Sequence, residues 1–271
     1  MTTVVMTGDG CRGSWQIGVL LYLRSKGLEP KKYVGISSGS LVAALMSQIE
    51  PNAASNALQK ITHISSVFSF KWNFLFGTGF YSSRPLERML RELLEYHRLP
   101  KGRRVAGTVS FVDVESGTLH YKDVNDLADE DIITAVLSSI SIPGLIAPYR
   151  YPYVDGGAME INPVNYALSK GEKSIAIIMG RPMEPVKFEK PTGLFKGLKI
   201  GYRALDLMMH SMCVDDLLSG AMAGTGADIQ LFEPIKHLAG TLDFSRSRDL
   251  FNHGFKGSYK RTDVVKAMRN L

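Results

Sequence analysis

The chain has few of the residues that build metal centres or covalent cross-links. Only two of its 271 residues are cysteines, Cys11 and Cys213, and its six histidines show no paired metal-binding spacing. Two cysteines are too few for a disulfide framework or a cysteine-based zinc site. The sequence therefore predicts a protein without a metal centre and without structural disulfides.

Long hydrophobic runs are also lacking. No segment approaches the roughly eighteen consecutive apolar residues of a membrane-spanning helix, and the start, MTTVVMTGDG, lacks the basic and apolar regions of a secretion signal. No internal repeat, low-complexity tract or linker divides the chain. We therefore expect a cytoplasmic protein with a single domain over residues 1–271.

The charge balance is mildly basic, with a net charge of +6 at pH 7. This charge suits an anionic partner, either a lipid headgroup surface or a nucleic acid, and it is equally typical of a solvated basic surface. No arginine-rich arm, zinc finger or aromatic RNA-binding motif accompanies the basic residues. We therefore expect no nucleic acid partner.

Units of strand, turn and helix follow one another near the N-terminus. Thr3–Met6 has the pattern of a short strand, Gly8–Gly13 that of a glycine-rich turn, and Ser14–Gly27 that of a helix. A second unit joins a strand at Lys32–Ile36 to an apolar helix at Ser40–Ile49. Alternating units of this kind predict an α/β protein with a layered sheet.

Further elements extend this pattern. The run SIAIIM at Ser174–Met179 is typical of a strand buried on both faces, and Arg104–Asp113 with Thr118–Tyr121 predicts an antiparallel hairpin at the edge of the sheet. Pro185–Pro191 is predicted to be an exposed connection. Helices are predicted at Pro85–Tyr96, Asp129–Ile140, Leu198–Ala223 and Tyr259–Asn270.

The second turn carries a serine between two glycines. Gly35, Ser37 and Gly39 fit the pattern G-x-S-x-G, in which the glycines let the chain turn sharply from a strand into a helix and expose the serine hydroxyl. At a helix N-terminus, backbone N–H groups favour the negative charge that develops during acyl transfer. A glycine-rich helix start without catalytic function is the alternative interpretation.

The first turn fits a second glycine motif, G-x-G-x-x-G. It consists of Gly8, Asp9, Gly10, Cys11, Arg12 and Gly13. Between a strand and a helix this motif is typical of dinucleotide binding, which also needs an acidic residue at the end of the second strand to hold the ribose. The second strand ends in Ser37 instead, and the nearest acid, Glu29, precedes it. The dinucleotide interpretation therefore lacks its main contact.

The same loop suits acyl transfer. Its exposed N–H groups, chiefly those of Asp9, Gly10 and Cys11, are expected to converge on a carbonyl oxygen as an oxyanion hole. Arg12 adds positive charge nearby, although a plain surface side chain is an equally good interpretation of this arginine. The two turns are then expected to meet at the carboxyl edge of the sheet, where open α/β folds place their sites.

A base for the serine is found in an aspartate rather than a histidine. None of the six histidines lies in a motif typical of a catalytic triad. Asp155 follows a short predicted strand and precedes Gly156 and Gly157, which permit close approach of another chain segment. A simple Asp-Gly turn is the alternative.

Taken together, these motifs resemble the patatin-like phospholipase family. The resemblance rests on the glycine loop at Gly8–Gly13, the serine turn at Gly35–Gly39 and the D-G-G sequence at Asp155–Gly157. Stretches around them are also similar to family segments, namely Gly79-Phe80-Tyr81, Ser138-Ser139 with Ile142-Pro143-Gly144, and Asn162-Pro163-Val164. The similarity covers about residues 3–180 and, more loosely, the helical remainder.

The resemblance implies a three-layer α/β/α sandwich with a mostly parallel central sheet. It implies a lipid acyl hydrolase of the phospholipase A or lysophospholipase type, in which Ser37 attacks the ester and Asp155 takes its proton. The glycine loop then binds the oxyanion, and neither cofactor nor metal takes part. Asp9 departs from the three consecutive glycines usual in the family and adds an acid beside the site.

Two other functions remain as alternatives. A protein that has lost turnover through Asp9 would be a catalytically silent lipid-binding scaffold of the same fold. A dinucleotide-binding oxidoreductase is the second alternative and is distinguished by nicotinamide or flavin binding.

Two segments suit contact with a lipid. An aromatic residue stands at every second position from 68 to 76, which places five rings on one face of an extended segment. That face is expected either to pack on the core or to form a lip at a bilayer. Leu194–Met212 mixes basic and apolar residues, as a membrane-surface helix or a core helix does. We therefore expect a lipid substrate and, at most, peripheral membrane contact. The five aromatic residues are Phe68, Phe70, Trp72, Phe74 and Phe76.

Overall fold

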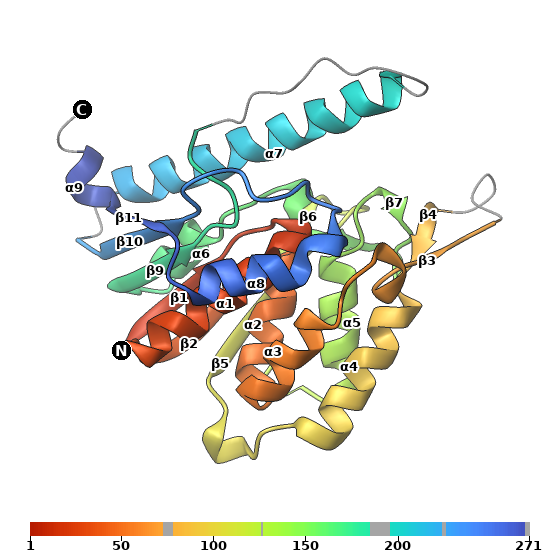
Figure 1. Ribbon diagram of the computed structural model, residues 1–271, viewed down its shortest axis with the longest axis horizontal. Coiled ribbons are helices and arrows are strands. Elements are labelled where there is room, and N and C mark those ends of the chain that lie inside the picture. Colours follow the sequence, from red (N-terminus) through yellow and green to blue (C-terminus); the bar gives the residue numbers. More distant parts are fainter. Residues whose placement is uncertain (73–77, 126, 185–195, 224–225, 269–271) are drawn as a thin grey trace.

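A mostly parallel sheet forms the centre of the molecule (Figure 1). The computed structural model describes the whole chain except residues 73–77, 126, 185–195, 224–225 and 269–271. The strand order is β11-β10-β9-β1-β2-β5-β6, and β8 also pairs with β5. The parallel strands are β1 (Thr2–Met6), β2 (Pro30–Ile36), β5 (Ala106–Asp113), β9 (Ser174–Ile178) and β10 (Asp228–Glu233). The antiparallel strands are β6 (Thr118–Asp123), β8 (Tyr153–Asp155) and β11 (Lys260–Asp263).

Helices cover both faces of this sheet (Figure 1). One face carries α1 (Gly13–Ser25), α2 (Ser38–Gln48), α3 (Pro51–Gln59), α4 (Arg84–His97), α5 (Asp129–Ser139) and α8 (Ser247–Phe255). The other face carries α6 (Val164–Ser169), α7 (Lys196–Met222) and α9 (Val264–Met268). The predicted three-layer α/β/α architecture is confirmed.

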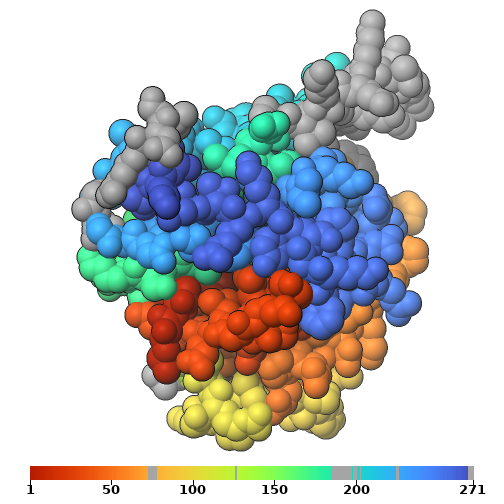
Figure 2. Space-filling view, turned by 60° about the vertical axis from the view of Figure 1, so that its left-hand side comes forward, coloured from red at the N-terminus to blue at the C-terminus, as the bar shows by residue number. Residues whose placement is uncertain are grey.

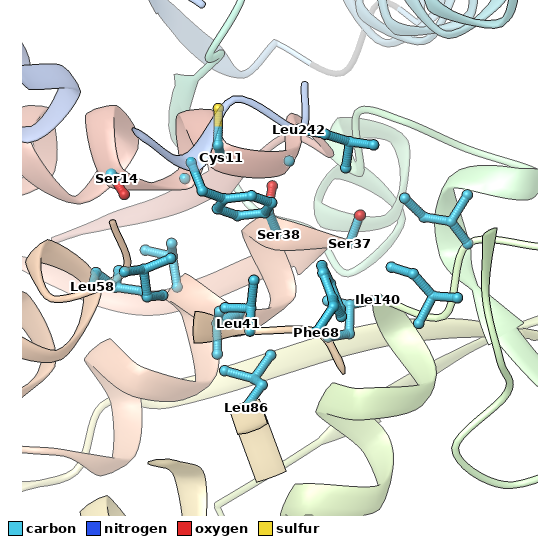
Figure 3. A pocket seen from close by; sticks show the side chains of 18 residues that line it. Cys11, Ser14, Ser37, Ser38, Leu41, Leu58, Phe68, Leu86, Ile140 and Leu242 are labelled. Atoms are coloured by element: carbon cyan, nitrogen blue, oxygen red, sulfur yellow. The ribbon is translucent and has the colours of Figure 1, made fainter. Parts of the chain in front are cut away.

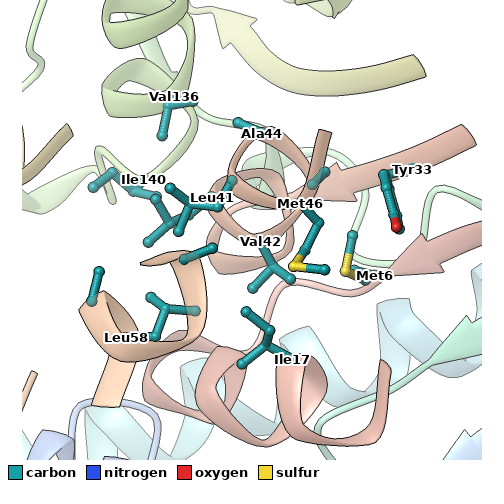
Figure 4. Packing of buried hydrophobic residues seen from close by; sticks show 14 of the residues in the cluster. Met6, Ile17, Tyr33, Leu41, Val42, Ala44, Met46, Leu58, Val136 and Ile140 are labelled. Carbon is teal, nitrogen blue, oxygen red and sulfur yellow. The ribbon is translucent and has the colours of Figure 1, made fainter. Parts of the chain in front are cut away.

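Burial on both faces explains the continuous apolar runs of the central strands. Along β1, Val4 and Met6 pack on the α2 side, whereas Val5 packs on the α7 side. Successive strand residues point to opposite faces, so a strand covered twice needs apolar residues at every position. Figure 4 shows Met6 beside Val42 and Met46 of α2, in the larger of the two resulting clusters.

A small second sheet lies beside α4 and α5 (Figure 1). It contains β3 (Ser69–Phe70), β4 (Gly79–Ser82) and β7 (Gly144–Ile146). Of the aromatic residues predicted to share one face, Phe68 is buried, while Phe70 is 46% and Trp72 is 90% exposed. Of the three described rings, one therefore packs in the core and two are exposed at the surface. Phe74, Phe76 and the predicted connection Pro185–Pro191 lie outside the described residues.

The structure corrects one predicted helix. Tyr259–Asn270 was expected to be helical throughout, but Lys260–Asp263 forms the edge strand β11, and within the described part of this range only Val264–Met268 forms a helix. β11 pairs antiparallel with β10, and this pairing outweighs the local helical tendency. Strand β10 and helices α3, α6 and α8 were not predicted from the sequence.

None of the helices in the described part of the chain is long and apolar enough to cross a membrane. Within the same residues, no group of three or more His, Cys, Asp or Glu side chains is placed to hold a metal ion.

Helix α8 packs against α1 at very short range (Figures 1 and 2). A Cβ added at Gly254 would lie 2.4 Å from the Trp15 carbonyl oxygen, and one at Gly18 would lie 2.3 Å from the Phe251 carbonyl oxygen. Only hydrogen fits at these two positions. This contact fixes the C-terminal segment on the N-terminal helix, next to the glycine loop.

We expect Gly254→Ala to lower the melting temperature by several degrees, because the added methyl group overlaps the backbone of α1. Helix propensity alone predicts the opposite sign, since alanine favours a helix by about 1 kcal/mol over glycine. The matched control is Gly201→Ala in α7, where an added Cβ meets no described atom within 4 Å and thermal stability should be unchanged or higher. Equal melting temperatures for Gly254→Ala and wild type would contradict the close packing.

Candidate active site

Strand β5 brings two distant chain segments together. β2 pairs with β5 as far as Ile36, which lies opposite Ser110. β6 pairs with the other edge of β5. Beyond the end of β2, β8 therefore pairs with the same edge of β5 as β2 does, and Asp155 lies opposite Phe111. The last residues of β2 and β8 therefore lie opposite two consecutive residues of β5, Ser110 and Phe111. Ser37, which follows Ile36, meets Asp155 at this point.

The serine turn is a tight and strained connection. Ser37 has φ 54° and ψ −126°, and it is the only non-glycine residue with positive φ in the described part of the chain. A Cβ at Gly35 would lie 2.1 Å from the Gly39 carbonyl oxygen, and a Cβ at Gly39 would lie 2.3 Å from the Met6 carbonyl oxygen. The flanking glycines thus let the turn pack directly against the end of β1. Strain of this kind is found at nucleophile turns.

The structure places Ser37 and Asp155 in direct contact. Ser37 Oγ donates a hydrogen bond to Asp155 Oδ2 at 2.7 Å, and both side chains are buried. The Gly157 N–H donates to Asp155 Oδ1, also at 2.7 Å. Gly156 packs against Ser110, where an added Cβ would come within 2.6 Å of the hydroxyl oxygen. The carboxylate is held from two sides, with one oxygen directed at the serine.

Burial controls the protonation of Asp155. Removal from water raises the pKa of this carboxyl group to about 7, against the opposing effect of the hydrogen bonds from Ser37 and the Gly157 N–H. No lysine, arginine or histidine of the described residues forms an ion pair with Asp155. A carboxylate with a pKa near neutrality is a stronger base than an ordinary aspartate.

The glycine loop lies against the serine turn. A Cβ at Gly8 would be 3.2 Å from the Ser37 Cβ, and one at Gly13 would be 3.4 Å from the Ser38 Cβ. The loop passes through a short 3₁₀ helix, η1 (Gly10–Arg12), into α1. Gly10, with φ 60°, lines the same pocket as Ser37. All six loop residues are thus at or directly behind the site.

Two of the three predicted oxyanion donors have partners within the protein. The Asp9 N–H donates to Ser38 Oγ at 3.0 Å, and the Cys11 N–H donates to the Thr241 carbonyl oxygen at 2.8 Å. Cys11 Sγ also contacts the Gly240 carbonyl oxygen. A segment from the C-terminal part of the chain therefore covers the loop in this conformation. The sequence contained no signal for this contact.

The carboxylate of Asp9 is bound by residues that follow β1 and β9. It is fully buried and accepts hydrogen bonds from Arg181 Nε at 2.6 Å, from the Gly180 N–H at 2.8 Å and from the Thr7 hydroxyl. Burial alone would raise the pKa of this carboxyl group, but Arg181 and Arg12 hold it below its ordinary value. With φ −137°, the backbone of Asp9 needs no glycine. The departure from the family pattern is therefore accommodated by an ion pair behind the loop.

Two cavities adjoin the serine and the aspartate. The first, of about 50 Å³, includes Ser37 and Gly10 in a wall that is otherwise mainly apolar (Figure 3). Its apolar side chains include Leu41, Leu58, Phe68, Leu86, Ile140 and Leu242. The second cavity, of about 350 Å³, includes Asp155 and Gly157 and reaches Leu205 and Met209 of α7. Leu242 lines both cavities.

Sequence reasoning missed two residues that support the site. Ser139 Oγ accepts a hydrogen bond from the Ser37 N–H at 3.1 Å, although the pair Ser138-Ser139 was already part of the family resemblance. Arg181 neutralises Asp9 across 172 positions of sequence. The only available signal was indirect, because a buried aspartate in a glycine loop requires a cation somewhere.

The sequence matches the family model described as patatin-like phospholipase over residues 4–168, a range that includes both Ser37 and Asp155. No curated protein sequence matches the chain significantly. Among solved structures, the crystal structure of VipD from Legionella pneumophila is similar, with a TM-score of 0.44 and 13% identity over 97% of this chain and 68% of that one. The family match covers more than half of the chain. This protein belongs to the patatin-like phospholipase family.

Proposed function

We propose that the protein hydrolyses carboxylic esters of lipids, with Ser37 as the nucleophile and Asp155 as the general base. Family membership supports a lipid acyl hydrolase. The observation that carries the proposal is the 2.7 Å hydrogen bond from Ser37 Oγ to a buried carboxylate, at the wall of an apolar pocket. A nucleophile and a base within this distance meet the geometric requirement for proton transfer.

The proposed reaction has two halves. Ser37 Oγ attacks the ester carbonyl carbon while its proton passes to Asp155, and the carbonyl oxygen becomes an oxyanion. When the intermediate collapses, the bond to the alcohol oxygen breaks and Asp155 returns the proton to that alcohol. Water then gives a proton to Asp155, attacks the acyl-enzyme and releases the fatty acid. The proton finally returns to Ser37, so the enzyme is regenerated.

The glycine loop is the proposed oxyanion site. Gly10 and Cys11 belong to η1, which leads directly into the N-terminus of α1, where the helix dipole also favours negative charge. For the Cys11 N–H to act on the substrate, the substrate oxygen must replace the Thr241 carbonyl oxygen as its acceptor. The proposed function thus requires a local displacement of the segment around Thr241. If that displacement does not occur, the chain acts as a lipid-binding protein without turnover, which is the second candidate.

The two cavities suggest how an ester is oriented. The apolar pocket beside Ser37 is proposed to take the acyl chain, because it offers few polar partners and has Leu58 and Leu86 in its wall. The larger cavity beside Asp155 is proposed to take the leaving alcohol, which must receive the proton from that carboxyl group. Exposed Phe70 and Trp72 support peripheral contact with a lipid surface during this exchange.

We expect Ser37→Ala to lower ester hydrolysis by more than about a thousandfold and to abolish labelling by a fluorophosphonate probe, because the attacking oxygen is removed. The matched control is Ser38→Ala, which removes the neighbouring hydroxyl of the same turn and should leave the protein open to labelling. Labelling and hydrolysis can be measured on the same purified samples. Undiminished labelling of Ser37→Ala would exclude this serine as the nucleophile.

We expect kcat/KM to rise with pH and to level off above an inflection near 7, because only the ionised form of Asp155 accepts the serine proton. A soluble chromogenic ester allows the profile to be measured between about pH 5 and pH 9, with Ser37→Ala as the background. An inflection near the ordinary aspartate value would contradict the role assigned to burial.

Asp155→Asn should be inactive and should gain stability relative to wild type as the pH rises. The folded-state pKa of Asp155 lies above its unfolded value, so ionisation between about pH 4 and pH 7 destabilises the folded wild type. Asparagine does not ionise, and the difference in unfolding free energy between the two proteins should shift by a few kcal/mol over this range. Denaturant unfolding of both proteins at about pH 4 and about pH 7 measures this difference in unfolding free energy. A difference that does not change with pH would mean that Asp155 titrates normally.

A further inference from the structure

A groove of about 650 Å³ lies between helices α3 and α4. The two helices are neighbours on the same face of the sheet (Figure 1). The residues that each of them contributes to the groove are three or four positions apart, so one face of each helix lines it. The groove is larger than either cavity at the catalytic site, and the proposed reaction does not use it.

The floor of this groove is apolar, whereas its rim is polar. Exposed Asn56, Lys60 and Glu92 stand on the rim, which therefore carries charges of both signs and favours no charged ligand. An apolar ligand is covered by the floor and needs no partner from the rim. The groove thus suits a hydrocarbon chain. The floor residues are Ala53, Ala57, Ile61, Met89 and Leu93.

Ile61 stands between the groove and the proposed acyl pocket. Of the described residues, Ile61 alone lines both of them, and its side chain is buried. It follows α3, and its N–H donates to the carbonyl oxygen of Leu58, which lines the acyl pocket. Figure 3 shows Leu58 on the opposite side of this pocket from Ser37. The end of α3 therefore forms the far wall of the acyl pocket, and the groove begins behind that wall.

The acyl pocket alone is too small for a long chain. Its volume of about 50 Å³ gives room for only about four groups of the size of a water molecule. One acyl chain of a bilayer lipid spans half of the hydrocarbon core, which is roughly 15 Å. The first few carbons of such a chain fill the pocket, and the remaining carbons need a further apolar compartment.

We propose that the groove between α3 and α4 binds the distal part of a long acyl chain, which reaches it past Ile61. The inference rests on the proposed function, in which the acyl carbonyl group lies at Ser37. Rotation of the Ile61 side chain joins the acyl pocket to the groove without movement of either helix. Each methylene group that the groove covers then strengthens binding about fourfold. Ile61 is therefore a residue that determines acyl-chain length, and long acyl groups are preferred to short ones.

The first arm of the test measures binding without turnover, in the Ser37→Ala protein. Sodium dodecanoate, kept below its micellar concentration, and sodium butyrate are titrated separately while the melting temperature is followed. Dodecanoate should raise the melting temperature at a concentration at least about tenfold lower than butyrate. Asn56→Trp places a ring in the groove from an exposed position and should remove this advantage. Arg88→Trp, at an exposed position of α4 outside the groove, is the matched control and should retain it. An unchanged advantage in the Asn56→Trp protein would overturn the groove as the binding site.

The second arm measures the selection of chain length during turnover. The ratio of kcat/KM for a dodecanoyl ester to that for a butyryl ester of the same chromogenic alcohol should rise at least about threefold in Ile61→Ala, because the wall between pocket and groove is removed. Ile140→Ala is the matched control. It makes the same change in the wall of the acyl pocket but does not line the groove, so it should raise the ratio less. Equal ratios in the two variants would overturn the passage at Ile61. Absence of all turnover would refute the proposed function, while the binding arm still decides the groove.

Discussion

The proposed chemistry depends on one constraint, the meeting of two strand ends on β5. Ile36 and Asp155 lie opposite consecutive residues of this strand, and the serine after Ile36 reaches the carboxylate at 2.7 Å. Proton transfer requires this distance, and an error of 1 Å at the reacting atoms lowers rates severely. Regular backbone pairing fixes strand ends more rigidly than loops, so the sheet itself sets the separation of nucleophile and base.

Two buried aspartates beside this point have opposite protonation behaviour, and the difference comes from their neighbours. Asp155 has hydrogen-bond donors but no ion pair with any cation of the described residues, so burial raises its pKa to about 7. Asp9 is as deeply buried, but Arg181 and Arg12 keep its pKa low. The first suits a proton acceptor and the second suits a permanent ion pair that supports the loop. Separate environments thus suit two identical side chains to two different roles.

Local features of the chain were predictable, whereas contacts between distant segments were not. The glycines around Ser37 reflect the local backbone conformation, and the apolar runs of β1 and β9 reflect burial on both faces. The turn and these strands can therefore be predicted from short sequence patterns. The edge strand β11 was missed because its conformation depends on pairing with β10. The resemblance assigned Asp155 a role, but neither its distance from Ser37 nor its raised pKa could be read from the residues around it.

Residues beyond the family match shape the surroundings of the site. Three contacts come from the part of the chain after residue 168. Arg181 neutralises Asp9, and the Thr241 carbonyl oxygen accepts a hydrogen bond from the Cys11 N–H. Leu242 and helix α7 line the cavity beside Asp155. The matched region contains the serine, the aspartate and the glycine loop. Most residues that line the proposed acyl pocket also lie in the matched region. The C-terminal third of the chain instead lines much of the cavity beside Asp155, through which the alcohol is proposed to leave. In the proposed mechanism, the N-terminal part provides the reacting groups, and the C-terminal part determines which leaving group fits and when the oxyanion donors become accessible.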